Sequence, residues 1–466
     1  MAHRARVAVI GGGISGLTAA LRLRQGLGPD AHIDVFDAGD RLGGILHTTE
    51  VGGRQVDVGA EAFIVRRPEA LELVRELGLG DRVVSPTAMR PAIWSGGGLY
   101  PLPAPALMGI PASVESVAEL VDSDDLTRMS AEADRELRWR AGADPSVGDF
   151  VADRFGPSVV ARSVDPMLGG VYSSLAADIG VREALPALAT RLDAGAPSLT
   201  TAVNEVIGAG AGASGPVFGT LVGGYRVLVD ALVEAASANV RLGGTITGLR
   251  HERDSWAIGV DDDPQEYDAV ILAVPAQVAA ALLASECPGM AGPLAEVSGA
   301  SSVVVSLALA PGTRLPDHSG VLVATGEQLR AKAFTFSSQK WQHLADRCAP
   351  VSVRASFGRF GAPVPSELEE PGVDDRLVAE ALADLDEVCG AAGVGALSSQ
   401  MTDVVVQRWT GGLPVYAPGH LARMAEVLAG RPRRLALAGS AYGGVGVPAC
   451  IAQAGRAAAE VLADLG

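Results

Sequence analysis

One short stretch near the amino end limits the fold more than any other part of the sequence. Residues 7–10 are all apolar, which is typical of a strand buried on both faces of a parallel sheet. Gly11, Gly13 and Gly16 follow in G-x-G-x-x-G spacing, and residues 17–23 continue as a helix. The first glycine permits a tight turn, the second admits a pyrophosphate, and the third lets helix and strand pack closely. The stretch therefore predicts a dinucleotide site at a helix N-terminus, against the alternative of an ordinary glycine-rich turn.

A second strand pattern follows, and it ends in an acidic residue at the spacing found in dinucleotide-binding sites. Residues 32–37 have the pattern of a strand that ends at Asp37, 21 residues after Gly16. A carboxylate at this spacing can accept both ribose hydroxyls of an adenosine. The alternative role for a lone aspartate at a strand end is a turn cap. The spacing favours the ribose contact.

The next residues distinguish two dinucleotides. Arg41 could bind the 2′-phosphate of NADP, but Asp37 would repel that phosphate. The adjacent pair Gly43 and Gly44 instead resembles the second diphosphate-binding motif of FAD oxidoreductases. We therefore expect FAD as the cofactor.

Bulk properties exclude several classes of protein. The 466 residues are 48% hydrophobic and 20% charged, which is typical of a globular chain with two or three domains. The formal net charge of -17 argues against nucleic acid as a partner and against electrostatic docking to an anionic membrane. We expect at most peripheral membrane contact.

The apolar stretch 269–284 contains Pro275 and Gln277, so it predicts a strand and a helix rather than a membrane span. The first strand begins at Val7, which leaves no room for a separate signal peptide. The four cysteines are widely separated and form no C-x-x-C motif. This pattern predicts a reduced, cytoplasmic protein.

The middle of the chain has a helical pattern from about residue 111 to residue 192. The predicted helices in this insertion span residues 116–121, 130–139, 147–155 and 157–165. Residues 204–219 are rich in glycine and alanine and predict a flexible connection. Strand patterns resume after it.

The second half of the chain predicts a mixed sheet and a second nucleotide-binding unit. Residues 301–310 and 351–357 have strand patterns, and residues 374–390 have a clear helical period. The segment 435–448 is a strand and a glycine-rich turn that lead into a helix of small residues. Two such turns about 400 residues apart are what an FAD that spans a split domain requires.

The motifs together resemble the superfamily of amine oxidases, phytoene desaturases and protoporphyrinogen oxidases. Within it the sequence is more similar to the bacterial porphyrinogen oxidase family. The residues that carry this resemblance are 98–103, 108–111, 165–172, 409–420 and 439–448. The resemblance covers essentially the whole chain. Ala449 departs from the family, where an aspartate is common, and Ser173 and Ser174 replace an Ala-Gly pair.

The resemblance implies an α/β fold, α+β overall, with a Rossmann-like discontinuous FAD-binding domain, a mixed-sheet substrate-binding domain and an inserted helical domain. The expected ranges are 1–50 with 220–290 and 430–466 for the FAD-binding domain, 51–105 with 200–219 and 291–429 for the substrate-binding domain, and 106–199 for the helical domain.

The resemblance also implies a set of contacts to one non-covalent FAD per chain. The diphosphate lies on the first glycine turn, the ribose on Asp37, and the flavin ring near the loop that follows Val58 and near Trp409. The implied cofactor residues are Gly11, Gly12, Gly13, Ile14, Ser15, Gly16, Asp37, Ala38, Arg41, Gly43, Gly44, Ile45, Gly59, Ala60, Glu61, Ala62, Ile246, Trp409, Gly439, Ser440, Val445, Gly446 and Val447. For Ile246 and Trp409 a role in the core is the alternative. Cys450 could suggest covalent flavin attachment, but its context favours a packed thiol.

The implied reaction is the six-electron oxidation of a porphyrinogen by oxygen, with hydrogen peroxide as the second product. Flavin N5 carries the chemistry, so no protein residue is named as catalytic and no metal is required. Tyr416 and His420 belong to the matching motifs but have structural roles as the alternative. The substrate carries carboxylates, so the candidate substrate residues are Arg66, Arg67, Tyr100, Lys332 and Lys340, each with a surface or core role as the alternative.

Two porphyrinogens compete as substrate. The acidic chain suits coproporphyrinogen III, and Tyr100 replaces an arginine found in plant-type relatives that act on protoporphyrinogen IX. An amine oxidase would often have a lysine on the strand 301–309, which has none here. A carotenoid desaturase would need a more apolar tunnel, and a non-catalytic FAD protein stays as a further alternative. Partners beyond substrate and oxygen could include the chelatase that acts next.

Overall fold

The computed structural model describes residues 4–210, 215–260, 263–361 and 372–466. Its first sheet has five parallel strands in the order β12-β2-β1-β16-β22. These strands are β1 (Arg6–Ile10), β2 (His32–Asp37), β12 (Asn239–Leu242), β16 (Ala269–Leu272) and β22 (Leu435–Leu437). Val7 and Val9 enter one core and Ala8 and Ile10 another, because successive side chains point to opposite faces.

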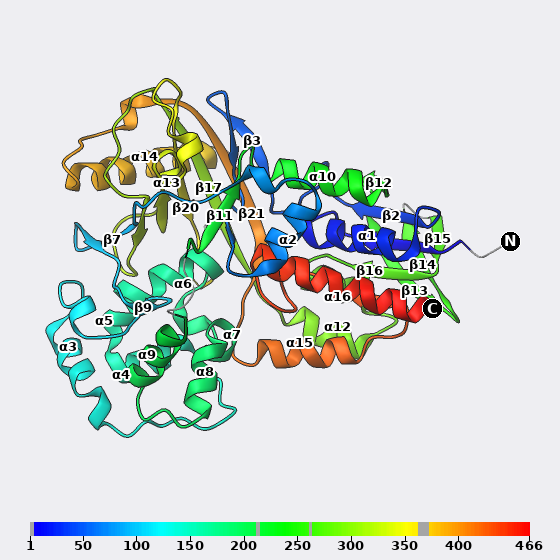
Figure 1. Cartoon of the computed structure of the whole chain (residues 1–466), viewed down its shortest axis with the longest axis horizontal. Coiled ribbons are helices and arrows are strands. Elements are labelled where there is room, and N and C mark those ends of the chain that lie inside the picture. Colours follow the sequence, from blue (N-terminus) through cyan, green and yellow to red (C-terminus); the bar gives the residue numbers. More distant parts are fainter. Residues whose placement is uncertain (1–3, 211–214, 261–262, 362–371) are drawn as a thin grey trace.

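Helices cover one face of this sheet, and a small sheet with further helices covers the other. The first face carries α1 (Ile14–Leu27), α2 (Pro68–Glu76), α10 (Arg226–Ala236) and α16 (Val447–Leu465). The second carries β13 (Ile246–Glu252), β14 (Ser255–Val260), β15 (Asp263–Tyr267), α11 (Ala276–Leu283), α12 (Pro288–Ala295) and α15 (His420–Ala429). Helices α1 and α16, blue and red in Figure 1, lie side by side although they are far apart in sequence.

The second large sheet has seven strands in the order β21-β17-β20-β19-β18-β7-β8, and only the β18–β7 pair is parallel. Its strands are β7 (Ala92–Ser95), β8 (Gly98–Pro101), β17 (Gly299–Leu309), β18 (Gly320–Val323), β19 (Ala333–Thr335), β20 (Val351–Phe357) and β21 (Met401–Pro414). Helix α14 (Val373–Ala391) packs on one face, where Val303, Val305 and Leu307 point.

Short strands and turns connect the larger elements of the fold. They are β3 (Thr48–Val51), β4 (Arg54–Asp57), β5 (Phe63–Ile64), β6 (Val83–Val84), β9 (Ala106–Leu107), β10 (Ile110–Pro111), β11 (Phe218–Leu221) and α13 (Ser337–Lys340), with 3-10 turns at Gly80–Arg82, Gln342–Leu344 and Ser398–Gln400.

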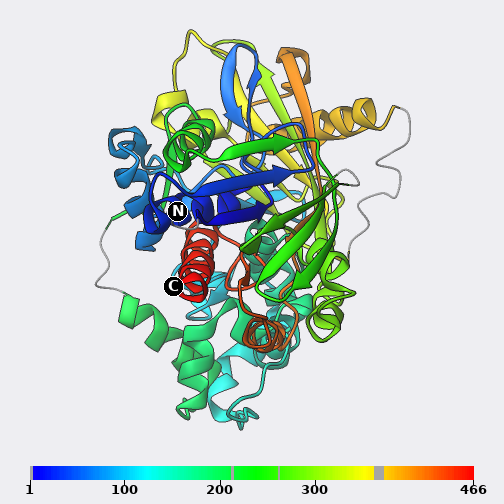
Figure 2. The same cartoon turned by 90° about the vertical axis from the view of Figure 1, so that its right-hand side faces the viewer.

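A helical unit with its own core lies below the sheets in Figure 1 and Figure 2. It contains α3 (Ser123–Ser130), α4 (Val147–Phe155), α5 (Pro157–Val159), α6 (Asp165–Tyr172), α7 (Val181–Ala184), α8 (Pro186–Asp193) and α9 (Leu199–Gly210), with 3-10 turns at Glu115–Val117, Glu132–Asp134 and Ala176–Asp178. A π-helical segment, Val160–Val164, joins α5 to α6 within the predicted helix 157–165. The predicted helix 116–121 is only the first of these 3-10 turns.

The predicted helix 130–139 is wrong, and a buried arginine explains why. Arg154 of α4 is 2% exposed and donates to the backbone carbonyls of Glu132, Arg135 and Glu136. These carbonyls would accept helical bonds if a helix continued through residues 130–139. The chain instead wraps around the guanidinium, which also pairs with the fully buried Glu132 carboxylate at 2.8 Å.

The predicted flexible connection 204–219 is wrong over its first part. Helix α9 runs to Gly210, and β11 begins at Phe218, while residues 211–214 lie outside the described residues. Ser198 Oγ accepts a hydrogen bond from the Thr201 amide, which caps the helix. Leu199, Ala202 and Val203, which precede the predicted segment, are buried in the helical core, and Ile207 packs against it. The helix is therefore anchored at its start and continues to Gly210 through residues that are mostly exposed.

The division into three domains remains a prediction, and the hydrophobic cores suggest two adjustments to its boundaries. Helix α9, expected in part within the substrate-binding domain, packs in the helical core. Helices α2, α12 and α15 belong to the two cores that flank the five-stranded sheet.

Replacing Arg154 by methionine should lower the free energy of unfolding by about 3–5 kcal/mol, because Glu132 is then left buried without its partner. Chemical denaturation followed by circular dichroism measures this loss. The matched control is Arg135→Met, since Arg135 is 35% exposed and pairs with an exposed aspartate. Equal losses in the two variants would contradict the role assigned to burial.

Candidate active site

The first glycine turn lies at the carboxyl ends of β1 and β16, where three backbone segments meet. Gly11 has a φ of +107°, and a Cβ at this position would lie 2.2 Å from the carbonyl oxygen of Ala273. A Cβ at Gly16 would lie 1.8 Å from the Gly11 oxygen. At Gly13 the nearest atom to such a Cβ would be 3.9 Å away, so the backbone there is open to a ligand. This is the division of roles predicted for the three glycines.

Asp37 ends β2 beside this turn. Its Oδ2 accepts a hydrogen bond from the Gly12 amide at 2.7 Å, and its Oδ1 accepts one from Gly39 at 2.8 Å. Each carboxylate oxygen has a second lone pair, so both can still accept a ribose hydroxyl. Gly243 donates to the Gly39 carbonyl at 2.9 Å, which brings the start of β13 at Ile246 to the same edge of the sheet.

The loop 41–46 forms a second wall opposite the first turn. The Gly43 amide donates to the Gly12 carbonyl at 2.8 Å, and Gly43 and Gly44 both have positive φ. Arg41 Nη2 donates to the Gly44 carbonyl at 2.7 Å, and its guanidinium lies 5.7 Å from the Trp409 ring. Arg41 therefore holds the loop in shape.

The second glycine turn joins β22 to α16. Tyr416 Oη donates to the Ser440 carbonyl at 2.5 Å and accepts from the Gly444 amide at 2.7 Å. His420 Nε2 lies 2.6 Å from the Ala441 carbonyl oxygen. Tyr416 and His420 thus brace the turn, which is the structural alternative considered for them. Cys450 is buried, and this burial raises the pKa of its thiol to about 11.

Both turns end in helices whose first amides are available to an anion. Within the described residues, α1 and α16 have no side-chain cap and no acidic residue in the first turn. Their N-termini lie close together, since Ser15 Oγ donates to the Cys450 carbonyl at 3.5 Å. Two open helix ends beside an open glycine backbone fit an FAD diphosphate and the electron-rich edge of its flavin ring.

The loop Gly59–Ala62 packs closely against Ile45 and Trp409. A Cβ at Gly59 would lie 1.9 Å from the Ile45 oxygen and 3.0 Å from Trp409 Cζ2. Trp409 Nε1 donates to the Val58 carbonyl at 2.9 Å, which fixes the indole against the loop. The loop and Trp409 therefore form one continuous surface.

The carboxylate of Glu61 in this loop has hydrogen-bond and ion-pair partners. Its carboxylate accepts from Lys340 Nζ at 2.7 Å and from Ser337 Oγ at 2.5 Å, and Arg354 Nη1 lies 3.7 Å away. Arg354 Nη2 also donates to the Gly59 carbonyl at 2.6 Å. Burial alone would raise the pKa of Glu61, but the charges of Lys340 and Arg354 outweigh it and lower the pKa to about 2. The ion pairs tie the loop to the seven-stranded sheet.

The candidate substrate residues are not gathered at one place. Arg67 is exposed, pairs with Glu69 at 3.2 Å and lies beside Gly444 of the second turn. Arg66 is exposed and donates to a backbone carbonyl at 3.2 Å. Tyr100 packs against the helical core, whereas Lys332 lies half-buried at the end of the sheet. Lys340 is committed to Glu61, and its role toward a substrate stays a prediction.

Sequence reasoning did not single out two arginines near this site. Arg354 is the one charge in the otherwise uncharged strand 351–357, and a lone buried charge of this kind was the available signal. Arg359 follows the same strand and had no comparable signal.

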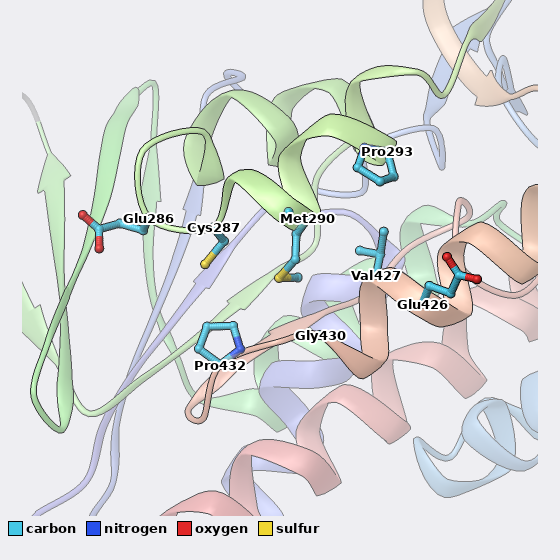
Figure 3. A pocket seen from close by; sticks show the side chains of 9 residues that line it. Glu286, Cys287, Met290, Pro293, Glu426, Val427, Gly430 and Pro432 are labelled. Atoms are coloured by element: carbon cyan, nitrogen blue, oxygen red, sulfur yellow. The ribbon is translucent and has the colours of Figure 1, made fainter.

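A separate surface hollow of about 450 Å³ lies between α12 and α15, away from both glycine turns (Figure 3). Met290 and Val427 form its apolar floor, with Glu286 and Glu426 at its ends. Among the described residues, no helix has the length and apolar character needed to cross a bilayer.

The fold and the paired turns define a dinucleotide-binding flavoprotein, and comparison with known proteins agrees. The family described as flavin containing amine oxidoreductase matches residues 14–462. The chain belongs to this family and, within it, to the bacterial porphyrinogen oxidases that bind FAD.

Its relatives match over nearly their full length. Proteins named coproporphyrinogen III oxidase from Mycobacterium leprae and Mycobacterium bovis are 48% and 47% identical to it, over 98% of this chain and 98% and 97% of theirs. The crystal structure named "Putative protoporphyrinogen oxidase" from Exiguobacterium sp. 255-15 superposes with a TM-score of 0.86 at 26% identity and covers 99% of both chains.

Replacing Asp37 by alanine should weaken FAD retention by about 1.5–3 kcal/mol, because a charge-assisted hydrogen bond to the ribose is lost. Flavin absorbance per chain after extended dialysis measures retention. Asp40→Ala is the control, since Asp40 is exposed three residues away. Equal occupancy in the two variants would contradict the ribose assignment.

Replacing Glu61 by glutamine should destabilise the fold by about 3 kcal/mol at pH 7, from a pKa near 2 in the folded state against about 4.3 in the unfolded chain. The depressed pKa means that the carboxylate stabilises the fold above pH 4.3 and that this contribution is lost as pH falls toward 2. The difference from wild type should therefore shrink between about pH 5 and pH 3 in denaturation experiments. Glu50→Gln, at an exposed position, should show no such dependence.

Proposed function

We propose that this protein is an FAD-dependent oxidase that converts coproporphyrinogen III to coproporphyrin III in haem biosynthesis. The observation that carries the proposal is identity of 47–48% over 98% of the chain with proteins named coproporphyrinogen III oxidase. A bovine protein named protoporphyrinogen oxidase is 28% identical over the same share of the chain, which supports the second candidate less strongly.

One FAD, held without a covalent bond, would lie across the two glycine turns. The first turn and Asp37 would hold the diphosphate and ribose, with Ile246 near the adenine. The loop Gly59–Ala62, Trp409 and the start of α16 would surround the flavin ring. The buried Cys450, whose pKa is raised to about 11, supports a thiol that packs rather than bonds to the flavin.

When bound, FAD supplies the two-electron chemistry, taking a hydride from a C–H bond and passing both electrons to oxygen. Coproporphyrinogen III loses six hydrogen atoms, that is six protons and six electrons, in three such rounds. Three oxygen molecules become three molecules of hydrogen peroxide, so atoms and electrons balance. The chain has no need of a nucleophile for this reaction.

The protein residues hold the reactants and set the electrostatic field. The N-terminus of α16 directs its open amides and positive dipole end at the region where negative charge would develop on the cofactor. Arg354 and Lys340 place two positive charges behind the loop Gly59–Ala62, one of them balanced by Glu61. The close packing around Gly59 keeps this loop rigid, which supports a fixed distance between cofactor and substrate.

A porphyrinogen with several propionates needs cations, although the chain as a whole has a net charge of -17. Arg67 lies beside Gly444 of the second turn, and this position supports a carboxylate contact there. We further propose a cytoplasmic location and transient contact with the chelatase that receives the product.

The packing supports a division in which α9 joins the helical domain and α2, α12 and α15 join the FAD-binding domain.

The purified holoenzyme should show a higher kcat/KM for coproporphyrinogen III than for protoporphyrinogen IX. The reason is that four propionates engage more of the available cations than two. Porphyrin fluorescence, measured side by side with anaerobically prepared substrates, gives both rates, and peroxide formation gives the stoichiometry. A higher kcat/KM for protoporphyrinogen IX would reverse the assignment, and turnover of neither would reject it.

A further inference from the structure

Two basic side chains lie together where the end of the seven-stranded sheet meets α6. Lys332 precedes β19, and Arg359 follows β20. Lys332 Nζ donates to Ser173 Oγ at 2.5 Å and to the Gly358 carbonyl at 2.6 Å. Arg359 donates to Thr325 Oγ1 at 3.1 Å and to the last carbonyl of β18 at 3.0 Å. Every acceptor here is electrically neutral.

Within the described residues, neither cation has a carboxylate within 4 Å. The charge of Asp165 is felt at Arg359, but the two side chains make no direct ion pair: Thr325 Oγ1 lies between them and donates to Asp165 Oδ2 at 2.8 Å. The buried Nε of Arg359 has no hydrogen-bond partner among those residues. Burial, and then the charge of Arg359, lowers the pKa of Lys332 to about 7. Two neighbouring half-buried cations without a direct carboxylate partner cost folding free energy, so a partner from outside the chain would account for them.

Strand register places this pair close to Trp409, which with the loop Gly59–Ala62 forms the surface proposed to face the flavin. Ser302 of β17 lies opposite Trp409 of β21. On the other side of β17, Val303 lies opposite Phe357, which makes Gly358 the next residue toward the same end of the sheet. Gly358 and Trp409 therefore flank β17, about 10 Å apart by two strand spacings.

The adjacent face of the sheet is open to a ligand. Side chains that face α14 are buried, whereas Ser302, Ser356 and Ala333, which alternate with them, are only half-buried. Gly169 and Gly170 of α6 face this region without side chains, and a Cβ at Gly169 would lie 3.4 Å from Arg359 Nε. Gly169 therefore packs against the buried Nε of Arg359, whereas Arg359 and Lys332 as whole side chains are only half-buried and keep part of their surface exposed.

We propose that Lys332 and Arg359 form a binding site for one carboxylate arm of the tetrapyrrole, an inference that rests on the proposed function. A carboxylate would accept from the remaining Nη protons of Arg359 and the remaining proton of Lys332, and it would neutralise one of the two charges. The site is separate from Arg67 and from the Lys340–Glu61 pair. It anchors the macrocycle between α6 and the sheet.

The test uses the FAD-loaded enzyme with Lys332→Met and Arg359→Met. Each change should raise the KM for coproporphyrinogen III roughly 10- to 100-fold, as expected for a lost charge-assisted hydrogen bond, and should change kcat less than about threefold. Binding of coproporphyrin III, followed by fluorescence titration, should weaken by a similar factor. FAD content should stay at the wild-type value.

The matched control is Arg330→Met, two residues from Lys332, because Arg330 is 65% exposed and lies 3.9 Å from Glu380. Its KM should not change. Thermal unfolding distinguishes a binding role from a structural one. If Lys332 serves binding, removing its unpaired charge should leave the melting temperature of Lys332→Met unchanged or higher. If Lys332 instead ties α6 to the sheet, the melting temperature should fall. If Lys332→Met folds poorly, porphyrin binding is measured with Lys332→Arg instead. This variant keeps the positive charge, so it should bind coproporphyrin III.

Wild-type turnover with unchanged KM and porphyrin affinity in both variants would overturn this site and leave the proposed function intact. Failure of the wild-type enzyme to oxidise either porphyrinogen would reject the proposed function instead. A lower melting temperature with unchanged porphyrin affinity would assign Lys332 to folding and would also overturn the site.

Discussion

The close approach of backbone atoms around Gly11 and Gly16 is the constraint on which the cofactor end of the structure depends. Any side chain at Gly11 would collide with Ala273, and any at Gly16 with the Gly11 carbonyl. This contact brings β1, α1 and β16 to one point, which is where the order of the parallel strands reverses. The adjacent Asp37, the loop 41–46 and the start of α16 are arranged around that point.

The balance of charge at the site differs from that of the whole chain. In this acidic protein, the basic residues Arg354, Lys340, Lys332 and Arg359 lie on or beside the seven-stranded sheet. Only Glu61 balances any of them by direct contact among the described residues. Partial burial of these cations costs folding free energy, which packing elsewhere in the fold offsets. The result is a local positive field suited to an anionic ligand.

The hydrophobic periodicity of the sequence correctly predicted helices and strands whose formation depends on residues close together in the chain. Residues 32–37, 147–155 and 351–357 form the predicted strands and helix, because their periodicity agrees with the burial found in the fold. The split site could also be predicted, since each glycine turn has its own motif. Asp37 was accessible to sequence reasoning because its spacing from Gly16 follows from the geometry of one strand, turn and helix.

Interactions between distant segments could not be predicted in this way. Lys340 and Glu61 are 279 residues apart, so their pairing depends on how two sheets are joined. Arg154 ends a helical pattern by taking carbonyls from a neighbouring segment, which periodicity alone does not show. In α9, the buried first turns anchor a helix that continues into a segment whose composition favours flexibility.

The split cofactor domain has a consequence for protein synthesis. Ser15 and Cys450 touch across 435 residues, so on the order of 20–90 s of translation separates their appearance at the ribosome. During that interval α1 exposes the apolar face that α16 later covers, and a holding chaperone would have its best target there. The native contact is thus among the slowest to form, because a long loop must close before it gains any burial. A circular permutant that joined these two helices in sequence would turn the most distant contact of the fold into a local one.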